Sequence, residues 1–198
     1  VLILSATIAR AQLLTSPQEQ LRVANLLERN KDSLLHLIST RPDDTLKVVQ
    51  YLELSSILLS RKEHDSAAVV AESAYTIALR LKHPRSIVNA LLSIGGGYGN
   101  FGSRDYERSL DYFLKAAQVA EDEGLYTETH STYYSILNLY FYKGDFPGAM
   151  ELTTKGLLLA EKNHDLKRIA HYYNLFGFIH LRQGNLAEAE RNYEQYLE

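Results

Sequence analysis

The residues most suggestive of chemistry form the stretch GYGNFG, Gly97 to Gly102, which fits the pattern GxGxxG. In dinucleotide-binding folds and protein kinases this pattern forms a phosphate-binding loop, because glycine lets the backbone approach a ligand closely. In the dinucleotide-binding folds the loop follows a strand, whereas the preceding RSIVNALLSI has its apolar residues at helical spacing. A kinase loop needs Val where Arg104 stands. We therefore interpret the match as coincidence and predict no nucleotide cofactor.

Other residue types that carry chemistry form no recognisable site. The seven histidines include no HExxH motif, and His64-Asp65 and His164-Asp165 fall in predicted turns. The acidic trio Glu121-Asp122-Glu123 ends a predicted helix and is expected to face solvent. There is no GxSxG elbow, and the lack of cysteine excludes a cysteine nucleophile, a disulfide and a thiolate metal site. We predict no catalytic residue and no metal site.

The composition is that of an ordinary globular protein and narrows the possible partners. The 198 residues are 45% hydrophobic and 23% charged, with a formal net charge of −3. Lysine and arginine are scattered rather than clustered, so we expect no nucleic-acid binding by this segment. The length suffices for one sizeable core or for a short array of repeats.

The first eleven residues, VLILSATIARA, have two interpretations. Their short apolar run ends in Ala9-Arg10-Ala11, a small-x-small pattern that precedes signal-peptidase cleavage, here after Ala11. We expect residues 1–11 to be the remnant of a signal peptide, and the alternative is a first helix that docks on the fold. No other apolar run reaches membrane-spanning length, so no further membrane contact is expected. The chain begins at Val1 and ends within a periodic segment, which we interpret as a piece of a longer protein.

Apolar residues recur at three- and four-residue spacing almost throughout, which predicts amphipathic helices and an all-α fold. The helical pattern also repeats. A small residue recurs at Ala67, Ser109, Ala149 and Ala189, at intervals of 42, 40 and 40 residues. A two-helix repeat cannot bury its apolar stripe alone, so neighbouring repeats must stack. The turns between paired helices are expected near residues 62–65, 102–105, 143–146 and 183–186.

These segments resemble the tetratricopeptide repeat (TPR), a pair of helices A and B that carry small and aromatic residues at fixed positions. In the third segment the residues at the aligned positions are Tyr133, Ile136, Leu137, Tyr140, Gly144-Asp145-Phe146, Ala149 and Gly156. In the fourth they are Tyr173, Phe176-Gly177, His180, Gly184-Asn185-Leu186, Ala189 and Tyr193. The second matches at Leu91, Ile94-Gly95, Tyr98, Gly102, Tyr106, Ser109, Phe113 and Ala116. Four residues depart from the pattern, namely Leu137, Thr153, His180 and Tyr196.

The resemblance implies a right-handed α-α superhelix of antiparallel helix pairs. The repeats would span about residues 46–84, 85–125, 126–165 and 166–198, with N-terminal helices at 12–45 capping the array. In this register Gly95, Tyr98 and Gly102 occupy TPR positions, whereas Gly96, Gly97 and Gly99 are left without a role. Each costs about 1 kcal/mol relative to alanine within a helix. We expect them to loosen the helix, and the alternative is close approach of a ligand or a neighbouring helix.

The TPR resemblance also implies a partner-binding surface on the concave face, formed by helix A of each repeat. Counting from the packing positions, the candidate binding residues are Asn89, Leu92, Tyr134, Asn138, Phe141, His171, Asn174 and Phe178. None of the counted positions holds Lys or Arg, so the carboxylate clamp known in the family is missing and chaperone tails are unlikely partners. A neutral strip of aromatic and amide groups suits an extended peptide backbone. The alternative is that the long helices and further repeats bury these residues.

The resemblance therefore indicates a non-enzymatic scaffold that binds a protein or peptide. The stretch from Asp32 to Ser60 resembles the opening of extracytoplasmic TPR regions in bacterial membrane-bound regulators with histidine kinase or DNA-binding outputs. This resemblance implies the sensory region of a signal-transduction protein in the periplasm or cell envelope. Two alternatives remain: a cytoplasmic TPR receptor for a signalling peptide, whose repeat length looks similar, and a general assembly scaffold.

Overall fold

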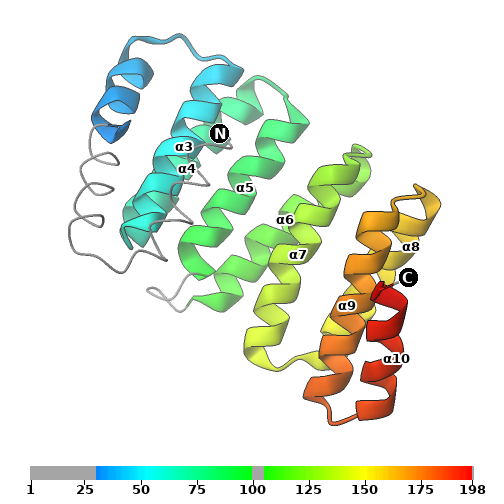
Figure 1. The fold of residues 1–198 in the computed structure, drawn as a ribbon. Helices are drawn as coiled ribbons and strands as arrows, with labels where there is room; N and C mark the ends of the chain where they lie inside the picture. Colours follow the sequence, from blue (N-terminus) through cyan, green and yellow to red (C-terminus); the bar gives the residue numbers. More distant parts are fainter. Residues whose placement is uncertain (1–29, 100–104, 198) are drawn as a thin grey trace. The chain divides into compact units, whose positions relative to one another are not determined.

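The computed structural model describes residues 30–99 and 105–197. Within them residues 30–40 are helical, and the labelled helices of Figure 1 follow. They are α3 (Thr45–Ser60), α4 (His64–Arg80), α5 (Pro84–Gly99), α6 (Tyr106–Asp122), α7 (Tyr126–Lys143), α8 (Phe146–Lys162), α9 (Leu166–Arg182) and α10 (Leu186–Leu197). The expected signal-peptide remnant at 1–11 and the capping segment up to residue 29 lie outside this description.

The chain divides into two compact units, residues 1–128 and 129–198, and each is described by itself. Within each unit, short turns make consecutive helices antiparallel (Figure 1). The core of the first unit contains three clusters, centred on Ile57, on Ala74 and on Leu91. The core of the second unit joins Leu137 and Ala149 to residues of α9 such as Leu175 and Ile179.

The described turns from α3 onward contain a residue in the left-handed conformation, and in the turn between α7 and α8 an acidic cap follows it. Gly144 has φ 74°, a conformation that glycine adopts without steric cost, and Asp145 then accepts a hydrogen bond from the Gly148 amide at 3.0 Å. Gly184 repeats the conformation with φ 80°. The turns expected near residues 62–65, 143–146 and 183–186 are confirmed, and the fourth lies mostly outside the described residues.

Glycine in helix A makes room for an aromatic ring of helix B. A Cβ on Gly95 would lie 2.5 Å from Phe113 Cε1, and one on Gly177 would lie 2.6 Å from Tyr193 Cε1. The third repeat reverses these volumes, because Leu137 stands where the glycine is expected and Thr153 where the ring is expected. Both side chains are buried. These two departures from the TPR pattern are therefore complementary: the large Leu137 occupies the glycine position of helix A, and the small Thr153 occupies the aromatic position of helix B.

The described part of the glycine-rich stretch, which ends at Gly99, is helical. Helix α5 continues through Gly99, and within residues 30–83 the elements that precede it are helices. A Cβ on Gly97 would lie 3.0 Å from Ala68 Cβ and 3.2 Å from Ala68 Cα, so Gly97 lets α5 approach α4 closely. Of the two roles expected for these glycines, Gly97 therefore has the alternative one, which is to let a neighbouring helix approach closely, rather than to loosen its own helix. Gly96 is different, because only Leu59 Cδ1 at 3.9 Å would be near an added Cβ. Its packing does not require glycine.

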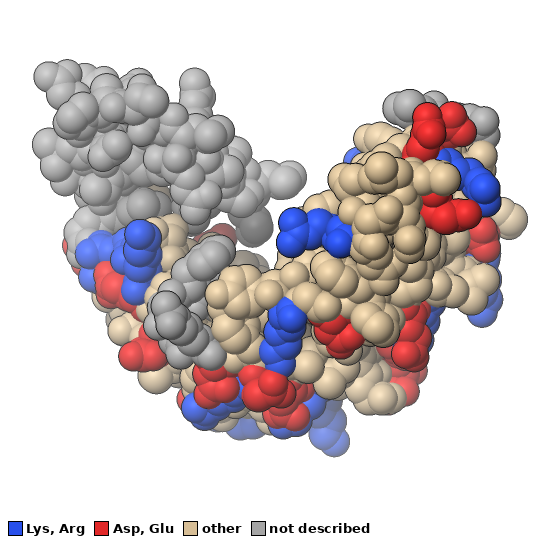
Figure 2. Space-filling view, turned by 90° about the horizontal axis from the view of Figure 1, so that it is seen from below, with Lys and Arg blue, Asp and Glu red and all other residues tan. Residues whose placement is uncertain are grey.

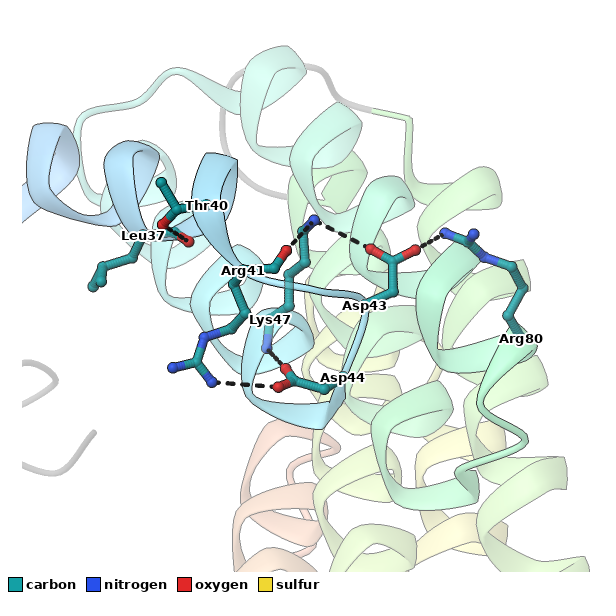
Figure 3. Close-up of polar contacts among 7 residues, drawn as sticks. All are labelled: Leu37, Thr40, Arg41, Asp43, Asp44, Lys47 and Arg80. Atoms are coloured by element: carbon teal, nitrogen blue, oxygen red, sulfur yellow. Dashed lines mark hydrogen bonds and ion pairs between the residues drawn. The ribbon is translucent and has the colours of Figure 1, made fainter.

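Ion pairs join the segment before α3 to the end of α4 (Figure 3). Asp43 lies 3.1 Å from Lys47 Nζ and 2.6 Å from Arg80 Nη2. Lys47 also donates to the Arg41 carbonyl at 2.9 Å, and its amide donates to the Asp44 cap at 2.7 Å. The hydrogen bond from Lys47, with smaller contributions from the charges of Arg80 and Lys47, lowers the pKa of Asp43. The contacts fix the start of α3 on the last turn of α4.

Candidate functional site

The second unit contains a cleft of about 300 Å³ between α7 and α9. Helix α7 contributes four of its lining residues, and helix α9 contributes the other four. They are His130, Ser131, Tyr134 and Leu137 from α7, and Arg168, His171, Tyr172 and Leu175 from α9.

The spacing of residues along each helix explains why these side chains share one face. On α9 the residues Arg168, His171 and Leu175 follow one another at three- and four-residue steps, which place side chains on one side of an α-helix. On α7 Ser131 and Tyr134 do the same. A helix that alternates steps of three and four residues therefore presents a continuous stripe toward its neighbour.

Aromatic contacts hold the stripes of α7 and α9 together. The rings of Tyr134 and His171 are 5.9 Å apart between centroids, and those of Phe141 and Phe178 are 5.1 Å apart in an edge-to-face arrangement. We call these four residues the aromatic strip. Tyr134 is 51% exposed, so its ring remains accessible to a ligand.

Two of the lining residues, His130 of α7 and Tyr172 of α9, form a hydrogen-bonded pair. His130 Nδ1 and the Tyr172 hydroxyl form a short hydrogen bond, and either group can donate depending on the histidine tautomer. Both residues are buried. Burial, followed by the positive charge of Arg168, lowers the pKa of His130 to about 4. The imidazole is therefore neutral at pH 7, and Gly156 of α8 leaves the space that the Tyr172 ring occupies.

Arg168 supplies a positive charge at the N-terminal end of α9. Asp165 caps this helix by accepting from the Arg168 amide at 3.1 Å, and its carboxylate also pairs with the Arg168 guanidinium. The pairing fixes a side chain that would otherwise sample many rotamers. Desolvation lowers the pKa of His171, which favours the uncharged form of this lining residue. Arg168 and Asp165 are the charged groups that meet at this end of the cleft.

Arg168 is a charged lining residue that lies outside the counted positions, and the counted positions themselves hold no Lys or Arg. The counted positions of the fourth repeat began at His171, one helical turn too late to include it. The sequence did contain a signal for it: Arg168 stands three residues before His171, and residues three apart on a helix lie next to each other on its surface. Ser131, one helical turn before Tyr134 on α7, also lines the cleft.

The expected binding residues fall in both units. Tyr134 and His171 line the cleft. Phe141 and Phe178 pair beyond it, as described above, and near them Asn138 is exposed while Asn174 is half-buried. In the first unit Asn89 is exposed on α5, and Leu92 packs beside the cluster that contains Leu91. The structure thus brings six of the eight residues onto α7 and α9, whose facing stripes they share, and leaves Asn89 and Leu92 in the other unit.

The surface chemistry outside the cleft is mixed. Figure 2 shows Lys and Arg interspersed with Asp and Glu over the face in view. Among the described residues, no group of three or more His, Asp or Glu side chains is arranged to hold a metal ion. None of the described helices combines the length and the apolar character that crossing a membrane requires.

Comparisons with known proteins identify the fold. No protein-family model and no curated protein matches the sequence. The structure is similar to BtubC (BKLC) from P. vanneervenii, with 17% identity, a TM-score of 0.68, and coverage of 98% of this chain and 86% of that chain. A putative kinesin light chain of TPR-like repeats from Podosopora anserina has 12% identity, a TM-score of 0.68, and coverage of 98% and 92%.

A third similar structure is aspartyl phosphate phosphatase F from Bacillus subtilis, with 15% identity and a TM-score of 0.66. The match covers 96% of this chain and 59% of that chain. Identities at this level show a shared fold and leave function to be argued from the site. The chain therefore has the all-α fold of TPR-like helical repeats that its sequence predicts.

Proposed function

We propose that this protein is a non-enzymatic module that binds a peptide segment of a partner in the cleft between α7 and α9. The observation that carries the proposal is the lining of that cleft. Leu137 and Leu175 give it an apolar floor, Tyr134 and His171 form an aromatic wall, and Arg168 is fixed at one end. An apolar cleft with a few placed polar groups is the usual form of a binding site.

The chemistry of the lining suits one apolar side chain of an extended peptide. Burying such a side chain contributes about 1.5–3 kcal/mol, which would anchor a short segment. Asn138 and Asn174 lie along the same helices, and their amides can both donate to and accept from peptide groups. The site would thus combine one apolar anchor with hydrogen bonds to the backbone.

In finer terms, we propose a receptor for a signalling peptide rather than the extracytoplasmic sensory region of a membrane-bound regulator. The fold similarity to aspartyl phosphate phosphatase F, over 96% of this chain, supports this choice. A receptor of this kind would be cytoplasmic and would keep residues 1–11. N-terminal sequencing of the full-length protein recovered from cells tests the point, and cleavage after Ala11 would favour the exported sensor instead.

Peptide selection tests the binding proposal. The 198-residue chain is immobilised and presented with a phage-displayed library of random nonapeptides, and an enriched peptide is then synthesised for titration. Tyr134→Ala should weaken its binding about tenfold, because removing an aromatic contact costs on the order of 1.4 kcal/mol. The matched control is Tyr142→Ala, since Tyr142 is also on α7 and is 59% exposed. It should leave the affinity unchanged.

Two results would sink the proposal. One is the absence of any enriched peptide on the wild-type chain. The other is a selected peptide that binds Tyr134→Ala as tightly as it binds wild type, when Tyr134→Ala and Tyr142→Ala both keep the wild-type melting temperature.

A further inference from the structure

We propose that the bound peptide carries a carboxylate four or six residues from its apolar anchor, and that Arg182 binds this carboxylate. This inference rests on the proposed function, because it extends the same site along α9. It names the chemical class of the partner segment: an extended peptide with one apolar and one acidic side chain at fixed spacing.

Arg182 continues the stripe that lines the cleft. His171, Leu175, Phe178 and Arg182 follow one another at steps of four, three and four residues, so they lie on one face of α9. The Arg182 guanidinium lies 6.0 Å from the centroid of the Phe178 ring. Phe178 in turn packs against Phe141 of α7. The cation therefore stands at the far end of the aromatic strip from Arg168.

The two arginines on this face differ in their ion pairs. Arg168 is paired with Asp165, which offsets its charge locally. Arg182 is exposed, and its side chain makes no ion pair with any residue that the structure describes. A guanidinium beside a ring can still present its N–H groups, whose fork matches a carboxylate. Charge complementarity at this end of the strip therefore selects an acidic side chain.

The distance along the helix fixes the spacing. Eleven residues separate His171 at the cleft from Arg182, and a rise of 1.5 Å per residue makes this about 16 Å. An extended chain advances about 3.3 Å per residue, and its successive side chains point to opposite faces. Spacings of four or six residues, about 13 or 20 Å, therefore bracket this length and place both side chains on the same face of the peptide. A partner bound by main-chain contacts along the aromatic strip would place its carboxylate at Arg182 when its apolar side chain fills the cleft.

The test repeats the nonapeptide selection on the wild-type chain, on Arg182→Gln and on Arg182→Lys. Wild type should enrich sequences with an apolar residue and an Asp or Glu four or six positions away, because the odd spacing of five points the two side chains to opposite faces. Arg182→Gln should keep the apolar preference and lose the acidic one, and Arg182→Lys should retain both. Arg191→Gln is the matched control, because Arg191 is an exposed arginine on α10 that pairs with Glu188. Its selected sequences should match those of wild type.

Titration of one synthetic peptide gives the magnitude. Replacing its Asp by Asn should weaken binding to wild type about three- to fivefold, as expected for an exposed ion pair, and should change nothing in Arg182→Gln. The loss should shrink at 0.5 M salt, where exposed charges are screened.

The outcomes separate this inference from the proposed function. Peptides that depend on Tyr134 but show no acidic preference would overturn the role of Arg182 and leave the binding site standing. The absence of any enriched peptide would overturn both. If light scattering instead finds a dimer that Arg182→Gln dissociates, a second copy of the chain occupies the strip and the peptide assignment is wrong.

Discussion

Lowering the pH from 7.5 to 5 should destabilise this protein through His130. Its pKa in the folded chain is about 4, and the ordinary value that applies to the unfolded chain is 6.5. Between these values the unfolded chain binds a proton that the folded chain does not. The stabilising contribution of the neutral His130 is therefore complete above pH 6.5 and is lost as the pH falls from 6.5 toward 4.

The size of the effect follows from the two pKa values. The full difference corresponds to about 3 kcal/mol at 1.36 kcal/mol per pKa unit, and about 2 kcal/mol of it should be lost by pH 5. Carboxylates also titrate as the pH falls, so the comparison needs a variant in which His130 cannot. In His130→Gln the side-chain amide can still bond the Tyr172 hydroxyl, but the group does not ionise in this range.

The assay is urea denaturation followed by circular dichroism at pH 7.5 and at pH 5. The wild type should lose about 2 kcal/mol more than His130→Gln between the two pH values. His36→Gln, a substitution of an exposed histidine, should behave as wild type does. Equal pH dependence of wild type and His130→Gln would refute the reasoning, because His130 would then not be buried in its neutral form.

Three further predictions concern packing and binding. Ala149→Leu places a large side chain at a fully buried position and should lower the free energy of unfolding by about 1–3 kcal/mol, measured by thermal melting; an unchanged melting temperature would remove the register of the third repeat. Gly96→Ala should stabilise α5 by up to about 1 kcal/mol because the added Cβ would meet only Leu59 Cδ1, at an ordinary van der Waals distance of 3.9 Å, whereas Gly97→Ala should destabilise it by pressing on the backbone of Ala68; the same sign for both in urea denaturation would contradict this packing. Asn138→Ala combined with Asn174→Ala should weaken the selected peptide without altering the melting temperature, and normal peptide binding by the double variant, or its unfolding, would remove the two amides from the site.

The fold follows from the sequence because the signals that specify it are local. Helical periodicity gives the elements, and pairs such as Gly144-Asp145 supply a left-handed residue followed by a cap. Each signal spans a few residues, so it can be read without knowing the tertiary structure. The position of Gly177 beneath an aromatic ring of its own repeat also follows from the family pattern.

The site is less predictable, because its central contacts join different repeats. His130 and Tyr172 are 42 residues apart, and the repeat pattern specifies packing positions without specifying which side chains meet across a boundary. Gly156 could be assigned to a small position of helix B, but its partner Tyr172 could not. Arg168 lies in the first turn of α9, directly after the Asp165 cap, whereas the first counted position on this helix is His171.

The reversed volumes of the third repeat limit how its parts can be exchanged. Gly95 and Gly177 each leave space for an aromatic ring from helix B of the same repeat. In the third repeat Leu137 occupies the glycine position, and Thr153 occupies the ring position of helix B. A chimaera that joined α7 to α10 would set Leu137 against Tyr193, and one that joined α9 to α8 would leave Gly177 opposite Thr153 with space unfilled. The interchangeable module of this array is therefore the matched helix pair, and single helices are not portable between repeats.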